Sequence, residues 1–253
     1  GTEDGFVDLM NSYAASMGLS NTLFQNSTGL PDGNHFSSAK DLAIMTSLLI
    51  DNFPETYSLY KEKYFTFNNI RQPNRNRLLW KDNSSDGVKT GHTESAGYCL
   101  ISSAKRNDMR LIAVVAGAKS DKERFNDTQR LLEYGFRFYS TQEVIKKDNA
   151  LKDVDVWGGK KNLVSLGAEN NIKLTLPRTT FKNITISYDF QNNLRAPIKE
   201  GQTLGTLVIK DGEKTLHTEN LVALNDVEAK GFFGRLWASL VLWFRGLFGL
   251  GDA

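Results

Sequence analysis

Helix-like and strand-like patterns of hydrophobic and polar residues follow one another in the first half of the chain. Apolar residues spaced i, i+3, i+4 and i+7 predict helices over 4–17, from Ser38 to Leu49 and over 120–138. The second helix begins at Ser38-x-x-Asp41, which has the form of a capping box. Nearly continuous apolar runs predict strands at 86–93, 97–104 and 111–116. We therefore expect a central antiparallel sheet accompanied by helices.

The pattern changes near residues 139–144. Short alternating runs follow, separated by Gly, Asn, Pro and Lys; they lie at 154–157, 172–176, 184–190, 204–209 and 216–224. Short, evenly spaced strands are typical of a small all-β sandwich or barrel. Because no cluster of reactive side chains accompanies these runs, we interpret this segment as a spacer or scaffold.

The residues after Gly231 show a third pattern. On a helical wheel the large apolar side chains fill one half-circle; they include Phe232, Phe233, Leu236, Trp237, Leu240, Trp243, Phe244 and Leu247. The other half holds Arg235, Arg245, Ala238, Ser239 and glycines. This pattern predicts an amphipathic helix that lies in a membrane interface, because the two arginines disfavour spanning the bilayer. A terminal helix packed on the protein's own core is the alternative.

Composition narrows the classes of function. The 253 residues are 40% hydrophobic and 24% charged, which is typical of one large or two smaller globular domains. The net charge of +2 gives no reason to expect a nucleic-acid partner. The single cysteine, Cys99, excludes an internal disulfide and a cysteine-based zinc site, and the three histidines lack H-x-x-x-H spacing. We expect neither a metal nor another cofactor.

One stretch has the character of a reaction site. Lys89-Thr90-Gly91 followed by His92 places an ammonium group, a hydroxyl and a bare backbone on one predicted strand. The lysine and threonine can hold a carboxylate, the glycine permits close approach of a substrate backbone, and the following peptide N–H can face an oxyanion. A K-T-G triplet alone is also compatible with an ordinary strand that carries a solvated lysine.

Four longer segments of the sequence add to the evidence from the K-T-G triplet. The segments NTLFQNSTGLPDGNHFSSAKDLA, QPNRNRLLW, DGVKTGHTESAGYCLISSAKR and RLIAVVAGAKS resemble the low-molecular-mass penicillin-binding proteins of the D-alanyl-D-alanine carboxypeptidase family. K-T-G is one of the three elements of such serine acyl enzymes, beside S-x-x-K and an S-x-N triplet. The resemblance implies an α+β fold: part of a β-lactamase/transpeptidase-like catalytic domain over 1–140, an all-β sandwich domain over 141–226 and an amphipathic membrane-anchor helix over 227–253.

The resemblance also implies an activity and a location. Members of this family remove the terminal D-alanine of peptidoglycan pentapeptides through a serine acyl-enzyme, and β-lactams inhibit them. The implied location is the periplasm, on the outer face of the cytoplasmic membrane, with the C-terminal helix as the attachment.

Roles for single residues follow from the same resemblance. Lys89 and Thr90, with Gly91, would bind the substrate carboxylate, and the His92 backbone N–H would form half of the oxyanion hole. Arg124 would support the carboxylate end of the site, with a helix-surface arginine as the alternative. His35 matches a position at the rim of the cleft, and we expect it to have a structural role in its loop.

The sequence departs from the family pattern at the nucleophile. No S-x-N occurs, and S-x-x-K occurs only at Ser37, Ser58 and Ser102, each of which has another expected role. The sequence also begins without an initiator Met or a signal-peptide pattern. We therefore expect a mature or truncated product that lacks the nucleophile, is inactive alone, and leaves the apolar faces of its sheet uncovered. A non-catalytic, membrane-tethered module that binds peptidoglycan or a partner is the alternative function, and a plain scaffold is a third.

Overall fold

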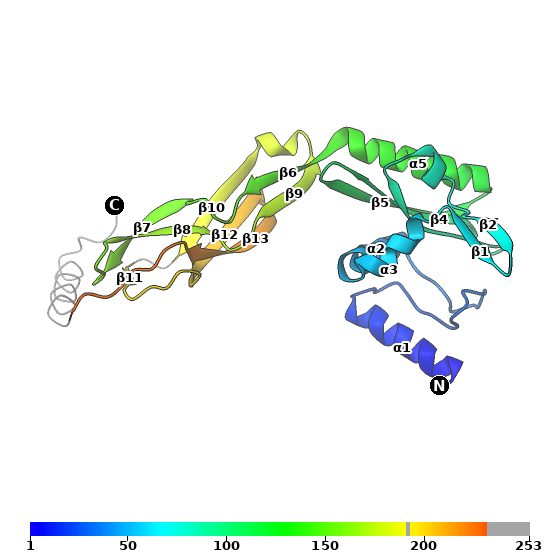
Figure 1. Cartoon of the computed structure of the whole chain (residues 1–253), viewed down its shortest axis with the longest axis horizontal. Helices are drawn as coiled ribbons and strands as arrows, with labels where there is room; N and C mark the ends of the chain where they lie inside the picture. The colour runs from blue at the N-terminus through cyan, green and yellow to red at the C-terminus, as the bar shows by residue number, and fades with distance from the viewer. Residues whose placement is uncertain (191–192, 232–253) are drawn as a thin grey trace. The chain divides into compact units, whose positions relative to one another are not determined.

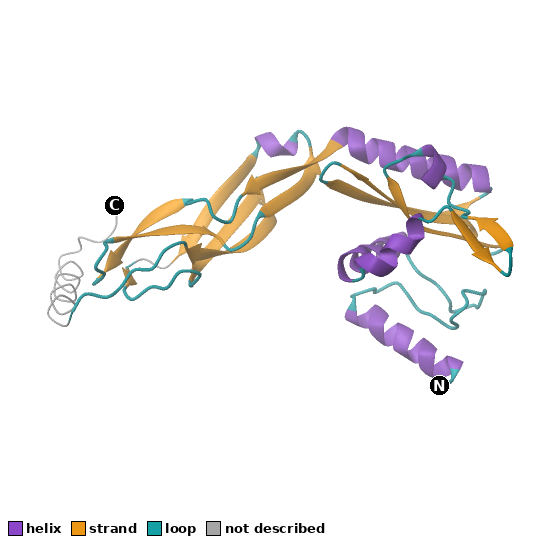
Figure 2. Ribbon diagram, in the orientation of Figure 1, coloured by secondary structure: helices purple, strands orange, loops and turns teal. Residues whose placement is uncertain are grey.

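The computed structural model divides the chain into two compact units, Gly1–Tyr139 and Ser140–Ala253. It describes residues 1–190 and 193–231, and Figures 1 and 2 show their helices and strands. The change of pattern near 139–144 in the sequence thus lies close to the division between the units. The finer domain boundaries, at 140 and 226, stay predictions.

The helices of the first unit include all three that the sequence predicts. They are α1 (Glu3–Ser16), α2 (Ala39–Asn52), α3 (Pro54–Tyr57), α4 (Leu78–Lys81) and α5 (Asp121–Phe138), with the 3₁₀ helix η1 at Ser58–Lys61. The side chain of Ser38 accepts a hydrogen bond from the backbone N–H of Asp41, and Ser120 caps α5 in the same way. The predicted cap at Ser38 is therefore confirmed.

The central sheet of the first unit is antiparallel, with the strand order β3-β4-β5. Its strands are β3 (Ser85–Thr93), β4 (Gly97–Arg106) and β5 (Met109–Ala118). Helix α5 packs over one face, where Leu100, Ala113, Leu132 and Phe136 form part of a buried core (Figure 1).

Sequence patterning missed the hairpin of β1 (Tyr64–Phe67) and β2 (Ile70–Pro73), whose side chains are exposed at every position.

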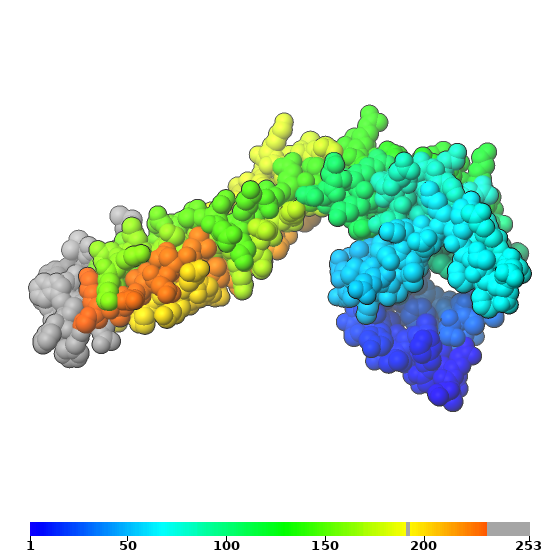
Figure 3. All heavy atoms as spheres, viewed as in Figure 1, coloured from blue at the N-terminus to red at the C-terminus, as the bar shows by residue number. Residues whose placement is uncertain are grey.

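The expected bare sheet is not observed. Helix α5 covers one face of the sheet and α2 packs against β5, as Figure 1 shows. Ile101, Ile112 and Val114 are half-buried as a result. Exposed apolar surface lies instead on α1, which Figure 3 shows in dark blue at the surface: Phe6 is 53% exposed and Tyr13 59%. The expectation was wrong because α5 packs on β4 and β5, and α2 also packs on β5.

The described part of the second unit is all-β apart from one short 3₁₀ helix, as predicted. Its strands are β6 (Tyr139–Ile145, which begins on the last residue of the first unit), β7 (Lys152–Trp157), β8 (Leu163–Ala168), β9 (Ile172–Pro177), β10 (Ile184–Phe190), β11 (Leu194–Arg195), β12 (Thr203–Asp211) and β13 (Lys214–Ala223), with the 3₁₀ helix η2 at Thr180–Lys182. Six strands form a sheet in the order β10-β12-β13-β8-β7-β11, and β6 pairs with β9. Strands β6, β8 and β11 were not predicted.

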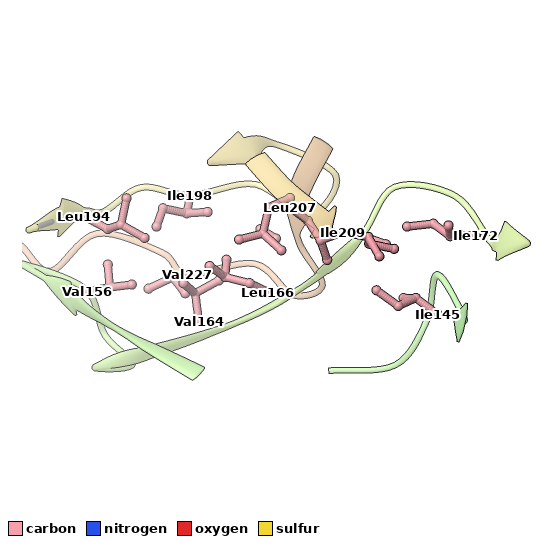
Figure 4. Packing of buried hydrophobic residues seen from close by; sticks show 13 residues of the cluster. Ile145, Val156, Val164, Leu166, Ile172, Leu194, Ile198, Leu207, Ile209 and Val227 are labelled. Carbon is pink, nitrogen blue, oxygen red and sulfur yellow. The ribbon is translucent and has the colours of Figure 1, made fainter. Parts of the chain in front are cut away.

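One apolar cluster holds the second unit together. Figure 4 shows its aliphatic side chains, which come from strands of the six-stranded sheet, from β6 and β9, and from the loops after β11 and β13. Val164, Leu166, Leu207, Ile209, Leu221 and Val227 are completely buried. Alternating burial along β12 explains the sequence pattern, because Leu207 and Ile209 point inward while their neighbours are partly exposed.

The predicted amphipathic helix lies outside the described residues. Among residues 1–190 and 193–231, no helix is both long enough and apolar enough to cross a membrane.

The buried cluster generates a stability prediction. Leu207→Ala removes a fully buried side chain from the centre of the second unit and should lower its free energy of unfolding by about 2–5 kcal/mol. Leu163→Ala is the matched control, because this leucine lies on neighbouring β8 and is 52% exposed. Urea denaturation followed by circular dichroism measures both. Equal losses in the two variants would contradict the assignment of the core.

Candidate active site

The K-T-G residues lie on β3, at the edge of the central sheet. Within the described chain β4 pairs with one side of β3, with Thr90 opposite Leu100 and His92 opposite Tyr98. An edge strand presents backbone N–H and C=O groups that an extended ligand can pair with as an added strand. Lys89 and His92 are exposed, and Thr90 is partly buried.

A cavity of about 660 Å³ runs along this strand. Its lining residues are Thr28, Gly29, Arg75, Lys89, Thr90, Gly91, His92, Thr93, Ala96, Tyr98, Cys99 and Arg124. The lining contains three permanent cations and, among the described residues, no carboxylate. Such a site favours an anionic ligand. The structure thus brings Lys89, Thr90, Gly91, His92 and Arg124 together.

Two glycines of β3 differ in the space that a Cβ atom would have. A Cβ atom on Gly87 would lie 2.5 Å from the Tyr57 hydroxyl, so packing within the unit explains that glycine. A Cβ on Gly91 would meet only the Cβ of Cys99, at an ordinary contact distance of 3.8 Å. The chain's own packing therefore does not require Gly91. A bare backbone at this point of the cavity wall favours close approach of a ligand instead.

Arg124 holds the end of the strand in place. Its guanidinium donates to the carbonyl oxygen of Gly91 at 2.9 Å and to that of Cys99 at 3.3 Å, and it pairs with Asp121 on its own helix. The residue is only 6% exposed. The alternative of a helix-surface arginine is therefore wrong. Its donors serve mainly to join α5 to β3 and β4 at the wall of the cavity.

Lys89 and His92, two further residues of the wall, each contact a neighbouring residue of the hairpin. The Lys89 ammonium donates to the carbonyl oxygen of Thr90 at 2.7 Å. The ring of His92 lies against that of Tyr98, with centroids 3.9 Å apart. Both side chains are exposed and line the cavity.

A buried polar network supports the first half of β3. The carbonyl oxygen of Gly87 accepts hydrogen bonds from Asn76 at 2.8 Å and from Ser102 at 2.9 Å. Nearby, the Tyr57 hydroxyl donates to Asp86 at 2.8 Å. Burial, together with the Asp86 carboxylate, raises the pKa of Tyr57 well above its usual value, so the phenol stays neutral.

Sequence reasoning missed Tyr57, Asn76 and Arg75. Tyr57 and Asn76 bond to groups that only the fold brings near, so no local pattern predicts these bonds. Arg75 and Asn76 both lie within the segment QPNRNRLLW, which was a usable signal for them.

His35 is not among the residues that line the cavity. Its Nδ1 accepts a hydrogen bond from the backbone N–H of Gln25 at 3.3 Å, and its ring packs edge-on against Phe24. These contacts are those of a residue that orders its own loop. A role at the rim of the cleft has no support in this arrangement.

The three serines of S-x-x-K form have other partners. The Ser37 hydroxyl lies 2.8 Å from that of Thr22, and the Ser58 hydroxyl donates to the Glu55 carbonyl at 2.6 Å. Ser102 is completely buried. None of the three lines the cavity of β3. Among the described residues, no three His, Cys, Asp or Glu side chains gather as metal ligands would.

Comparison with protein families gives two matches. Residues 1–120 match the peptidase S11 family, described as D-alanyl-D-alanine carboxypeptidase, and residues 139–229 match the C-terminal domain of penicillin-binding protein 5.

Individual relatives agree with the family matches. The chain is 46% identical over 251 residues to D-alanyl-D-alanine carboxypeptidase DacC of Escherichia coli, a match that covers 98% of the chain and 63% of the relative. It is 42% identical to DacA of the same organism, of which it covers 62%. The chain therefore spans less than two thirds of the length of these relatives.

Solved structures are similar too. Penicillin-binding protein 5 from Haemophilus influenzae has a TM-score of 0.74 at 41% identity, over 88% of this chain and 66% of that one. The D-alanyl-D-alanine carboxypeptidase DacD from Francisella tularensis has a TM-score of 0.65 at 31% identity, over 91% of this chain and 70% of that one.

The bonds of Arg124 generate a prediction for the cavity wall. Arg124→Met leaves the carbonyl groups of Gly91 and Cys99 without their donors and should lower the free energy of unfolding of the first unit by about 2–4 kcal/mol. Arg130→Met on the same helix is the matched control, because its side chain is 80% exposed and should change stability by less than about 0.5 kcal/mol. Denaturation curves decide: if the two variants are equally stable, Arg124 does not hold the wall.

Proposed function

The chain belongs to the D-alanyl-D-alanine carboxypeptidase family, and we propose that it serves the removal of the terminal D-alanine from peptidoglycan pentapeptides by a serine-type enzyme. The observation that carries this proposal is the cationic cavity along the edge strand β3, whose wall is Lys89-Thr90-Gly91-His92. A peptide that ends in a free carboxylate suits this wall, because the strand offers backbone pairing and the cations neutralise the terminal charge.

Each wall residue then has a distinct role. The Lys89 ammonium turns from the Thr90 carbonyl to the substrate carboxylate, and the Thr90 hydroxyl donates to the same group. The missing side chain at Gly91 lets the penultimate residue lie close to the strand. The His92 backbone N–H stabilises the oxyanion that forms when a serine attacks the peptide carbonyl.

The reaction proceeds in two steps. The serine oxygen bonds to the carbonyl carbon of the penultimate D-alanine, and the terminal D-alanine leaves with a proton on its nitrogen. Water then attacks the ester and frees the shortened peptide and the serine. The resemblance assigns this serine to an S-x-x-K element. We assign it to none of Ser37, Ser58 and Ser102, since their hydroxyls have the partners described above.

Arg124 acts here as a positioning residue. Its guanidinium bonds to two backbone carbonyls and is paired with Asp121, so it fixes the strand that bears Lys89 and Thr90. A β-lactam, which also carries a carboxylate beside a reactive carbonyl, fits the same wall, and β-lactams are therefore the proposed inhibitors.

The proposed location is the outer face of the cytoplasmic membrane, in the periplasm. The amphipathic sequence after Gly231 supports it, with the Phe, Trp and Leu half turned to the lipid. In this proposal residues 1–140 contribute to the catalytic domain, 141–226 form the β domain and 227–253 the membrane anchor.

A non-catalytic module that binds peptidoglycan remains the second candidate. It is favoured by one observation: the wall of the cleft is well formed, while no serine of S-x-x-K form lines it.

Acylation by a fluorescent penicillin tests the role of the Lys89 side chain in the proposed enzyme. In a protein that joins this chain to a segment with the S-x-x-K and S-x-N elements, Lys89→Ala should slow acylation by about 10- to 100-fold, because the inhibitor's carboxylate loses a charged partner. Lys105→Ala, an exposed lysine on neighbouring β4, should leave the rate unchanged. An unchanged rate in the Lys89 variant, or an adduct on Ser37, Ser58 or Ser102, would overturn the assignment.

Sedimentation with phosphatidylcholine vesicles tests the anchor. Leu240→Asp with Trp243→Asp places two carboxylates in the apolar half of the predicted helix and should weaken partitioning by at least about tenfold. Ala238→Asp with Ser239→Asp adds the same charges to the polar half and should have little effect. The wild type should stay bound at high salt, because the side chains from Asp226 to Asp252 carry three negative and three positive charges, which cancel. Co-sedimentation of the first variant with vesicles at the level of the wild type would refute the anchor.

A further inference from the structure

Three segments meet at one end of the β domain. They are the turn between β7 and β8, the short strand β11, and residues 228–231, where the described chain ends beside β7 and β11 (Figure 1). Backbone hydrogen bonds join them: the N–H of Lys160 donates to the carbonyl of Glu228, and that of Lys230 to the carbonyl of Gly158, both at 2.7 Å. Arg195 pairs with Trp157 across the β11–β7 ladder.

The side chains at this end are mostly basic. Lys160, Lys161, Arg195 and Lys230 are all exposed, and Glu228 is the one carboxylate among these segments. The carboxylate pairs with Lys160 at 2.5 Å, and both side chains are about two-thirds exposed. We call these four cations, with Trp157, the basic end of the β domain.

Charge at the basic end differs from charge in the predicted anchor. After Gly231 the side chains carry two positive charges, Arg235 and Arg245, and one negative charge, Asp252, so the tail itself has only a weak electrostatic preference for anionic lipid. The basic end, by contrast, carries three positive charges in excess, and the chain passes directly from Lys230 into the tail. Trp157 is half-buried at the same end, and tryptophan is enriched where proteins meet the headgroup region.

We propose that the basic end of the β domain rests on anionic phospholipid headgroups and is a second membrane contact beside the apolar tail. The proposal rests on the membrane attachment proposed above. An apolar helix in the interface fixes only its own depth and leaves the domain free to pivot about Gly231. Contact of the basic end with headgroups restrains that pivot, so the domain takes a defined orientation on an anionic surface.

The two contacts have different physical signatures. Insertion of the apolar tail depends weakly on salt and lipid charge, whereas attraction of basic side chains to an anionic surface declines within a Debye length. Each lysine near an anionic surface strengthens binding by about fivefold at low salt.

Charge reversal at matched positions tests the proposal in the full chain. Lys161→Glu with Lys230→Glu alters the basic end, and both side chains are exposed. Lys182→Glu with Lys214→Glu changes the net charge of the protein equally. These control lysines are exposed near the opposite end of the sheet, where Ile184 of β10 pairs with Asp211 of β12. Affinity is measured on phosphatidylcholine vesicles with and without phosphatidylglycerol, at low and high salt.

The wild type should bind the vesicles with phosphatidylglycerol more tightly, and high salt should remove this increment. The variant of the basic end should bind them at least about 30-fold more weakly than the wild type at low salt, yet bind pure phosphatidylcholine equally well. The control variant should keep the increment. Equal losses in both variants, or no increment in the wild type, overturn the proposal. Absence of all binding to phosphatidylcholine overturns the anchor instead.

Discussion

The position of the edge strand β3 is the constraint on which the first unit depends. Its backbone carbonyls are held at both ends by buried donors: Asn76 and Ser102 bond to Gly87, and Arg124 bonds to Gly91. These groups reach the strand from three elements or loops, so the strand cannot shift without breaking several buried hydrogen bonds. A site that binds an extended peptide by backbone pairing needs such rigidity, because a small displacement of the strand moves every donor at once.

Different residues of the cleft wall therefore bind the ligand and support the strand. Lys89, Thr90 and His92 line the cavity, whereas Arg124 is buried and bonds to the protein's own backbone. Gly91 lies between the two sets. Packing within the unit does not require a glycine at this position. We therefore attribute the glycine to the close approach of a ligand. The second unit, by contrast, has an aliphatic core without reactive groups, which suits a spacer or scaffold.

How much the sequence predicted depended on how local each signal was. The helices α1, α2 and α5 and the strands β3, β4 and β5 follow from periodicity, and the all-β second unit follows from its short alternating runs. The hairpin β1–β2 escaped because its apolar residues are exposed on both faces. The K-T-G wall could be predicted from its motif. The bonds of Asn76, Ser102 and Tyr57 could not, because they join residues far apart in sequence, and the buried state of Arg124 depends on packing between α5 and the sheet.

In the proposed function, a peptide ending in D-Ala-D-Ala lies along β3 with its carboxylate at Lys89 and Thr90. Amide chemical shifts of the chain, titrated with N-acetyl-D-Ala-D-Ala, test it most directly. We predict the largest shifts at the amides of residues 89–93 and 98–99, smaller ones at Arg75, and the loss of these shifts when the terminal carboxylate is replaced by an amide. Shifts that centre on other elements, or that persist with the amide, would contradict it.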